Sequence, residues 1–317
     1  MQTRETQEAD TGRAVRLASF GGPEVLDVVK VPKPQAGPGQ IRVRVTASGL
    51  NPMDWFMTAD VATAARFGLT LPAGFGTDYA GVVDQVGAGV TDFTVGDRVY
   101  GGALSRAAAD FVVINAAGGT AADEAHRTPD GVDDRTAAAL TIAGRTALAA
   151  LAIVAPQPHE TLLIGGAAGG VGVFAVQLAR IAGARVIGTG SIGSADFLRH
   201  LGAEPVTYGE GLVDRVRALA PQGVHAAIDL YGSEVVVAAR ALGIPDARIT
   251  TIAARVEGIT STTGSNASSE DLERVASLVA AGQIQVPIAA TFPVEQVRAA
   301  VELQASRHVK GKVVVEL

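Results

Sequence analysis

The chain of 317 residues contains no cysteine, which excludes disulfide bonds, thiolate nucleophiles and cysteine-ligated zinc. No stretch reaches the roughly 18 consecutive apolar residues of a membrane-spanning helix, so we expect no membrane segment. Residues 1–13 are polar and charged and lack the apolar core of a secretion signal. We therefore expect a mobile N-terminal tail on a cytoplasmic protein.

The sequence also lacks the features of a nucleic-acid partner and of a metal site. Its net charge is -6, its pI is near 5.4, and no basic run is present. The five histidines are widely scattered, and no two have the short spacing of metal ligands. We predict no bound metal. A hydrophobic fraction of 48% in a chain of this length is sufficient for two domains with separate cores.

The most informative segment is a buried strand that runs into a glycine-rich turn and a helix. Apolar and β-branched residues occupy 161–164, glycine and alanine dominate 165–172, and helical spacing follows from Phe174 to Ala182. A second strand, 184–189, completes a strand, helix and strand unit of about 30 residues, as a dinucleotide site requires. In the pattern G-x-G-x-x-G, Gly169 and Gly172 take the second and third places. Ala167 takes the first, directly after Gly166.

This turn predicts a cradle for a pyrophosphate, because glycines allow close approach of the backbone and the helix N-terminus attracts negative charge. A tight connection without a ligand is the alternative. An NAD site would place Asp or Glu at the end of the second strand, where a carboxylate repels a 2′-phosphate. Here Thr189, Gly190 and Ser191 are followed by no acid before Asp196. We predict NADPH, although the first basic residue after this point is Arg199.

The pattern of elements changes twice along the chain. Short strands with glycine and proline turns predict a barrel-like module up to about residue 115, and an alanine-rich helix follows at 133–155 with Asp133 or Asp134 as its N-cap. Strands and helices then alternate, which predicts a doubly wound parallel sheet of the α/β class. The expected limits are a tail (1–13), a β-rich catalytic domain (14–134), a Rossmann domain (135–264) and a return to the catalytic domain (265–317).

Several motifs in one order resemble the zinc-free quinone oxidoreductase branch of the medium-chain dehydrogenase/reductase superfamily over nearly the whole chain. They are FGGPEVL at 20–26, GLNPMDW at 49–55, GTDYAGVV at 76–83, VGDRVYG at 95–101, the glycine turn, and GKVV at 311–314. The resemblance implies a GroES-like catalytic domain built from both chain ends and a Rossmann domain that binds NADPH in the cleft between them. It also implies a homodimer.

The chain departs from zinc alcohol dehydrogenases of that superfamily at two motifs. Asn51 stands where those enzymes have a cysteine, and Thr77 precedes Asp78 where they have a histidine beside an acid. Without a Lewis acid, we expect hydride transfer from NADPH to an already electrophilic quinone or enone rather than alcohol oxidation. The alternatives are an enoyl-thioester or tailoring reductase of a secondary-metabolite pathway, and a non-catalytic NADPH-binding sensor.

The resemblance also implies roles for individual residues. Asn51, Thr146, Ile252 and Ala253 are expected beside the nicotinamide and its ribose, and Ser191 and Tyr208 beside the 2′-phosphate. The full set of expected cofactor contacts is Asn51, Thr146, Gly166, Ala167, Ala168, Gly169, Gly170, Val171, Thr189, Gly190, Ser191, Tyr208, Ile252, Ala253 and Lys312.

Structural alternatives stay open for several of these residues. Tyr208 fits a core aromatic, Thr146 a helix-packing residue, Asn51 a turn residue before proline, and Lys312 a solvated strand cation. Trp55 is a candidate wall of the acceptor pocket or a core residue. No obligatory proton donor stands out. Asn51, Asp54 and Tyr79 are the catalytic candidates by position, and solvent is an equal source of the proton.

Overall fold

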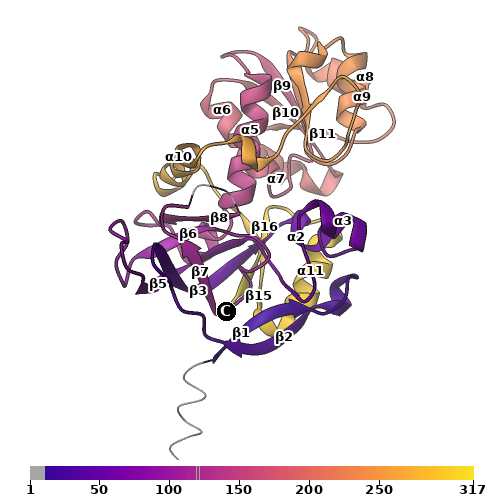
Figure 1. Cartoon of the computed structure of the whole chain (residues 1–317). Helices are drawn as coiled ribbons and strands as arrows, with labels where there is room; N and C mark the ends of the chain where they lie inside the picture. The colour runs from indigo at the N-terminus through magenta and orange to yellow at the C-terminus, as the bar shows by residue number, and fades with distance from the viewer. Residues whose placement is uncertain (1–10, 119, 121) are drawn as a thin grey trace, which may run out of the picture. The chain divides into compact units, whose positions relative to one another are not determined.

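The computed structural model describes residues 11–118, 120 and 122–317, which pack into two compact units (Figure 1). The first unit comprises the described residues of Met1–Ile142 together with Ile288–His308 and Lys312–Leu317, and the second comprises Ala143–Pro287 and Val309–Gly311. The domain limits expected at residues 134 and 264 stay predictions. Residues 11–13, predicted as tail, instead open the first strand, while the remainder of that tail lies outside the described residues.

The first unit is built mainly from antiparallel strands. Its strands are β1 (Thr11–Leu17), β2 (Asp27–Pro32), β3 (Gln40–Leu50), β4 (Ala73–Gly74), β5 (Asp78–Val86), β6 (Arg98–Ala103), β7 (Phe111–Asn115), β8 (Asp123–Arg127), β15 (Ile288–Pro293) and β16 (Lys312–Glu316). Its helices are η1 (Pro23–Val25), α2 (Pro52–Phe56), α3 (Val61–Arg66), α4 (Asp134–Ala137), η5 (Val294–Gln296) and α11 (Val297–Ala305).

These strands form two sheets around an apolar core. The smaller sheet has the order β2-β1-β4, and the larger has the order β15-β16-β3-β5-β6-β8, with β7 also paired to β3. Alternate residues of the long strand β3 point inward because side chains alternate across a strand. The core consists of Ile41, Val43, Val45, Tyr79, Val83, Phe93, Val99, Ala103, Ala107, Val112 and Ile114.

The second unit is a doubly wound α/β domain. Its elements are α5 (Thr141–Val154), β9 (Thr161–Gly165), α6 (Gly172–Ile181), β10 (Arg185–Gly190), η2 (Ile192–Ser194), α7 (Ala195–Leu201), β11 (Glu204–Thr207), α8 (Leu212–Leu219), β12 (Ala226–Asp229), α9 (Glu234–Ala241), η3 (Asp246–Arg248), β13 (Ile249–Thr251), β14 (Thr260–Ser261), η4 (Gly264–Asn266) and α10 (Ser269–Ala280).

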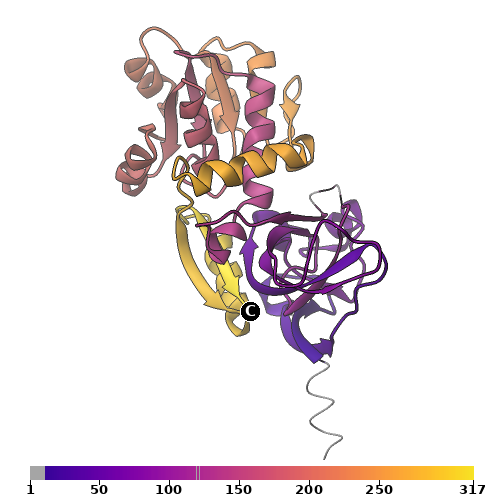
Figure 2. The ribbon, with the colours of Figure 1, turned by 90° about the vertical axis from the view of Figure 1, so that its left-hand side faces the viewer.

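All neighbouring strands of this sheet are parallel, in the order β11-β10-β9-β12-β13-β14. Counted from β9, this is the 3-2-1-4-5-6 order of a Rossmann fold. Val216 of α8 and Val236 of α9 pack on Leu163 and Ile187 of the sheet, and Figure 2 shows helices on both of its faces. The predicted α/β class with a Rossmann sheet and a β-rich module is confirmed.

Two local predictions need correction. The helix predicted at 133–155 is divided into α4 and α5, although Asp133 caps its start as expected by accepting a hydrogen bond from the Thr136 N–H at 2.8 Å. Strand β8 was not predicted, because its buried positions carry Glu124 and His126 rather than apolar residues. These two side chains satisfy each other through a contact of 3.0 Å between His126 Nε2 and Glu124 Oε2.

Candidate functional site

The carboxyl ends of the parallel strands place most of the predicted cofactor residues at one edge of the second unit. The glycine turn follows β9, Ser191 follows β10, Tyr208 follows β11 and Ile252 follows β13. Ligands of open α/β sheets bind at this edge, where the strand order reverses. In this unit the reversal lies at β9, directly below the glycine turn.

The glycines of the turn differ in what surrounds them. Gly166 has φ of +65°, so the tight turn is made one residue before the first place of the sequence pattern. A Cβ on Gly172 would lie 2.4 Å from the carbonyl oxygen of Ala167, which leaves no room for a side chain where α6 starts. A Cβ on Gly169 would meet only the Gly166 oxygen, at 3.4 Å. Gly172 is therefore required by the packing of the turn, whereas the space beside Gly169 is open.

The strand β10 holds this turn in place. The Gly166 N–H donates to Thr189 Oγ1 at 3.1 Å, and the Ala167 N–H donates to the Thr189 carbonyl oxygen at 3.2 Å. Thr189 is thus a structural support of the turn.

In the first turn of α6, the N–H groups of Val173 and Phe174 already donate to the carbonyl oxygens of Gly169 and Val171, at 3.0 and 3.2 Å. An anion at this helix N-terminus would therefore bind the N–H groups that precede Val173.

A cation that the sequence analysis missed lies beside the turn after β10. Lys310 Nζ donates to the carbonyl oxygen of Gly193, and the hydroxyls of Ser191 and Ser194 lie 3.0 Å apart in the same turn. The next residue, Gly311, donates its N–H to the carbonyl oxygen of Ala168 in the glycine turn at 2.9 Å. Sequence distance concealed Lys310, because it lies more than 100 residues after the turn that it contacts.

The structure also decides one of the open alternatives for this unit. Tyr208 is 53% exposed, so it is not a core aromatic. Ile252 and Ala253 follow β13, where Ile252 donates its N–H to the Asp229 carbonyl oxygen at 3.1 Å. Thr146 is buried on α5. The close-packed glycine turn and the exposed residues at the strand ends fit a dinucleotide.

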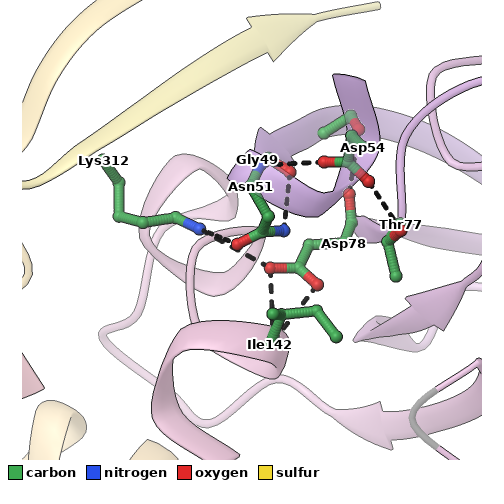
Figure 3. Close-up of polar contacts among 8 residues, drawn as sticks. Gly49, Asn51, Asp54, Thr77, Asp78, Ile142 and Lys312 are labelled. Carbon is green, nitrogen blue, oxygen red and sulfur yellow. Dashed lines mark hydrogen bonds and ion pairs between the residues drawn. The ribbon is translucent and has the colours of Figure 1, made fainter. Parts of the chain in front are cut away.

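A second group of predicted residues meets in the first unit, at the end of β3 (Figure 3). Asn51 is the N-cap of α2, and its backbone N–H donates to Asp54 Oδ2 at 2.8 Å. Thr77 Oγ1 donates to the other oxygen of Asp54 at 2.6 Å. The carboxylate of Asp78 accepts from the Ile142 N–H at 3.2 Å. Asp54 therefore serves the capping of α2, and Asp78 serves the start of α5.

Lys312 joins this group from β16 and is not a solvated strand cation, since it is only 3% exposed. Its Nζ donates to Asn51 Oδ1 at 2.6 Å and lies 3.7 Å from Asp78 Oδ2. β16 runs antiparallel to β3 with Val313 opposite Leu50, so the next pair in this register is Lys312 with Asn51. The sequence motifs gave no sign of this pairing.

Burial controls the protonation of this cluster. It raises the pKa of Asp54 to about 6, against the hydrogen bonds from Thr77 and Asn51. Burial likewise raises the pKa of Asp78 to about 7, opposed by the positive charge of Lys312. The same burial lowers the pKa of Lys312, and Asp78 opposes that change. The cluster thus holds a proton on its carboxylates close to neutral pH.

The other two named candidates are held by neighbours within the first unit. Tyr79 is fully buried in the core, its hydroxyl donates to the Glu124 carbonyl oxygen at 3.0 Å, and burial raises its pKa well above 10. The structure therefore gives no support to Tyr79 as a proton donor. Trp55 is half-buried on α2, and its indole N–H donates to Gln304 on α11.

Comparisons with known proteins agree with this architecture. The model of the alcohol dehydrogenase GroES-like domain matches residues 37–130, and the model described as zinc-binding dehydrogenase matches residues 201–315. A quinone oxidoreductase of Rattus norvegicus is 33% identical over 231 residues, which are 70% of this chain and 67% of that protein. A mycobacterial protein solved in complex with NADPH has a TM-score of 0.83 at 26% identity, covering 96% of this chain and 100% of that one.

A mycocerosic acid synthase-like polyketide synthase of Mycobacterium tuberculosis is 34% identical over 248 residues. The matched region is 77% of this chain but only 11% of that much longer protein. The chain belongs to the quinone oxidoreductase branch of the medium-chain dehydrogenase/reductase superfamily, as the motifs predicted. It is an NAD(P)-dependent oxidoreductase of that superfamily.

The zinc named by the second family model does not fit the residues present. Protein zinc sites favour sulfur and nitrogen ligands, whereas Asn51, Thr77 and Asp78 offer amide, hydroxyl and carboxylate oxygens. The ammonium of Lys312 already lies against Asn51 and near Asp78, where it would repel a second cation. Within the described residues, no group of three or more histidine, cysteine or acidic side chains is arranged to hold a metal ion. None of the described helices has the length and apolar character to cross a membrane.

Proposed function

We propose that this protein transfers hydride from NADPH to a quinone or another conjugated carbonyl acceptor without zinc. The observation that carries the proposal is the cluster of Asn51, Asp78 and Lys312, in which a lysine ammonium takes a position that would oppose a divalent cation. An acceptor that needs no Lewis acid suits such a site. Conjugated carbonyl compounds accept hydride without one because their double bonds are already polarised.

The residues of the chain would act by binding and orientation. NADPH supplies the hydride when it is bound. The turn from Gly166 to Val171 would hold the pyrophosphate. Asn51 and Thr146 are proposed beside the nicotinamide and its ribose, and Ile252 and Ala253 beside the nicotinamide amide. We assign no residue as the proton donor, and solvent is sufficient for an enolate or hydroquinone anion.

NADPH rather than NADH is supported by the turn after β10. The hydroxyls of Ser191 and Ser194 and the ammonium of Lys310 meet at this turn, and no acidic side chain lies in residues 189–195. Hydroxyls and an ammonium are suitable donors to a phosphate, whereas a carboxylate would repel it. The exposed ring of Tyr208, at the end of the neighbouring strand, is proposed as a further contact.

The test is a direct assay of NADPH oxidation with 1,4-benzoquinone and 9,10-phenanthrenequinone, compared with ethanol and NADP⁺ in the reverse direction. We expect turnover with the quinones and none with the alcohol. Titration of the fluorescence of NADPH and of NADH should show tighter binding of NADPH. Equal or tighter binding of NADH would overturn the cofactor assignment, and alcohol oxidation without quinone reduction would overturn the reaction class.

A second candidate is an enoyl-thioester reductase, which the similarity to a polyketide synthase favours. Crotonyl-CoA tested beside 1,4-benzoquinone separates the two, because a thioester reductase should prefer the former by kcat/KM. We further propose a cytoplasmic homodimer, supported by resemblance to the family. Light scattering after gel filtration measures the oligomeric state, and a monomer would refute that part.

A further inference from the structure

The carboxamide of Asn51 lies between an ammonium and a backbone carbonyl oxygen. On one side, Lys312 Nζ donates to Oδ1 at 2.6 Å. On the other side, the amide nitrogen faces the carbonyl oxygen of Gly49 at 3.4 Å. Figure 3 shows the contacts of this side chain with Lys312 and with the Gly49 oxygen.

Only one orientation of this carboxamide is compatible with its surroundings. If the oxygen and nitrogen exchanged places, the NH₂ group would face the Lys312 ammonium, and the amide oxygen would face the carbonyl oxygen of Gly49. Both contacts would be repulsive, and at this depth they would be little screened by water. The Lys312 ammonium and the Gly49 carbonyl oxygen therefore determine which atom of Asn51 points in each direction.

We propose that Lys312 is a positioning residue that fixes Asn51 as a hydrogen-bond acceptor for a hydroxyl of the nicotinamide ribose. An amide oxygen has two lone pairs, and Lys312 uses one of them. The second accepts from a donor, and the ribose hydroxyls are donors. Asp78 holds the ammonium in place, and the pairing of β16 with β3 brings the lysine opposite Asn51.

This inference rests on the proposed function, because it needs NADPH at Asn51. It goes further because Lys312 would influence NADPH binding by orienting the Asn51 carboxamide. Lys312 itself would not contact the cofactor. A lysine that merely stabilised the fold would affect cofactor binding equally with or without the Asn51 carboxamide. A positioning lysine would affect it only when that carboxamide is present.

A double-mutant cycle measures this difference. The variants are Lys312→Met, Asn51→Ala and the double variant, with NADPH dissociation constants from fluorescence titration. We expect Lys312→Met to weaken NADPH binding by about tenfold when Asn51 is present, as for loss of one charge-assisted hydrogen bond. In the Asn51→Ala background the effect should fall below about twofold. Equal effects in both backgrounds would overturn the proposal.

Two further variants keep the proposal testable if Lys312→Met does not fold. Lys312→Met leaves Asp78 buried without its ion-pair partner and is liable to unfold, whereas Lys312→Met combined with Asp78→Leu removes both charges and is expected to fold. The combined variant should still bind NADPH weakly, and wild-type affinity would refute the proposal. Lys312→Arg keeps the charge and should recover part of the affinity. The exposed Lys30→Met is the matched control and should bind as wild type.

Steady-state kinetics give a separate readout. Loss of Lys312 should raise the KM for NADPH and leave the KM for 1,4-benzoquinone within about twofold. A rise confined to the KM of the quinone would place Asn51 at the acceptor and overturn the proposal. Failure of the wild-type protein to bind NADPH would refute the proposed function itself. Normal binding without coupling between Lys312 and Asn51 would refute only the positioning role.

Discussion

Replacing Gly169 with alanine should weaken NADPH binding without lowering the stability of the protein. The Cβ of the new residue would meet only the Gly166 oxygen, at 3.4 Å, and Gly169 does not have a left-handed backbone conformation. Alanine at such a position typically stabilises a protein by about 0.4–1 kcal/mol, through the unfolded state. The methyl group would however occupy the space that the pyrophosphate needs for close approach to the backbone.

The expected loss follows from the hydrogen bonds at stake. One hydrogen bond to a charged group contributes about 1.5–3 kcal/mol, so losing one should raise the NADPH dissociation constant by roughly 10-fold to 150-fold. Fluorescence titration of NADPH measures this constant, and thermal denaturation measures stability in the same samples. Binding and stability are thus expected to change in opposite directions.

Gly172→Ala is the matched control within the same turn. Its Cβ would lie 2.4 Å from the Ala167 oxygen and 2.5 Å from the Gly166 oxygen, and both are backbone atoms that cannot rotate away. We expect overpacking to destabilise this variant by about 1–3 kcal/mol. If Gly169→Ala binds NADPH like the wild type, or if it loses stability as Gly172→Ala does, the separation of roles within the turn is wrong.

Three further outcomes are expected. Lys310→Gln should weaken NADPH binding about tenfold and leave NADH binding unchanged, since only NADPH carries the 2′-phosphate; equal losses for both cofactors would contradict this. Because the pKa of Asp78 is raised above its unfolded value, the native state holds an extra proton between about pH 4 and 7. The free energy of unfolding should therefore fall with rising pH in that window, by at most about 1.4 kcal/mol per pH unit for that proton. Urea titrations should show a shallower fall for Asp78→Asn, and an unchanged slope would argue against the titration of this group. EDTA should leave quinone reduction intact, and metal analysis should find no stoichiometric zinc, whereas activity lost with a removable zinc would refute the zinc-free mechanism.

Local sequence patterns predicted the Rossmann unit well, because strands such as β9 are continuous apolar runs and the glycine turn has a fixed spacing. These patterns failed where polar side chains are buried and hydrogen-bond to one another. Strand β8 was missed because Glu124 and His126 occupy its interior, and their contact is a property of the folded chain. The division between α4 and α5 was missed because alanine-rich sequence favours helix throughout.

The sequence predicted most residues of the candidate site, but it did not predict which of them contact one another. Asn51, Asp54 and Lys312 were all named from motifs, yet nothing in the sequence indicated that the lysine reaches the asparagine. That contact depends on the register between β3 and β16, which are separated by more than 260 residues. Lys310 was missed for the same reason.

The position of residues 310–312 in the sequence determines when their contacts can form during synthesis. Lys310 contacts the turn after β10, Gly311 contacts the glycine turn, and Lys312 pairs with Asn51. A nascent chain can form the parallel sheet and most of the barrel strands long before these residues leave the ribosome. The contacts at the two turns require residues 310 and 311, and the contact with Asn51 requires residue 312. A polypeptide ending before residue 310 would therefore lack both sets of contacts. The contacts of the proposed NADPH site that involve residues 310–312 thus form only after the parallel sheet has been synthesised.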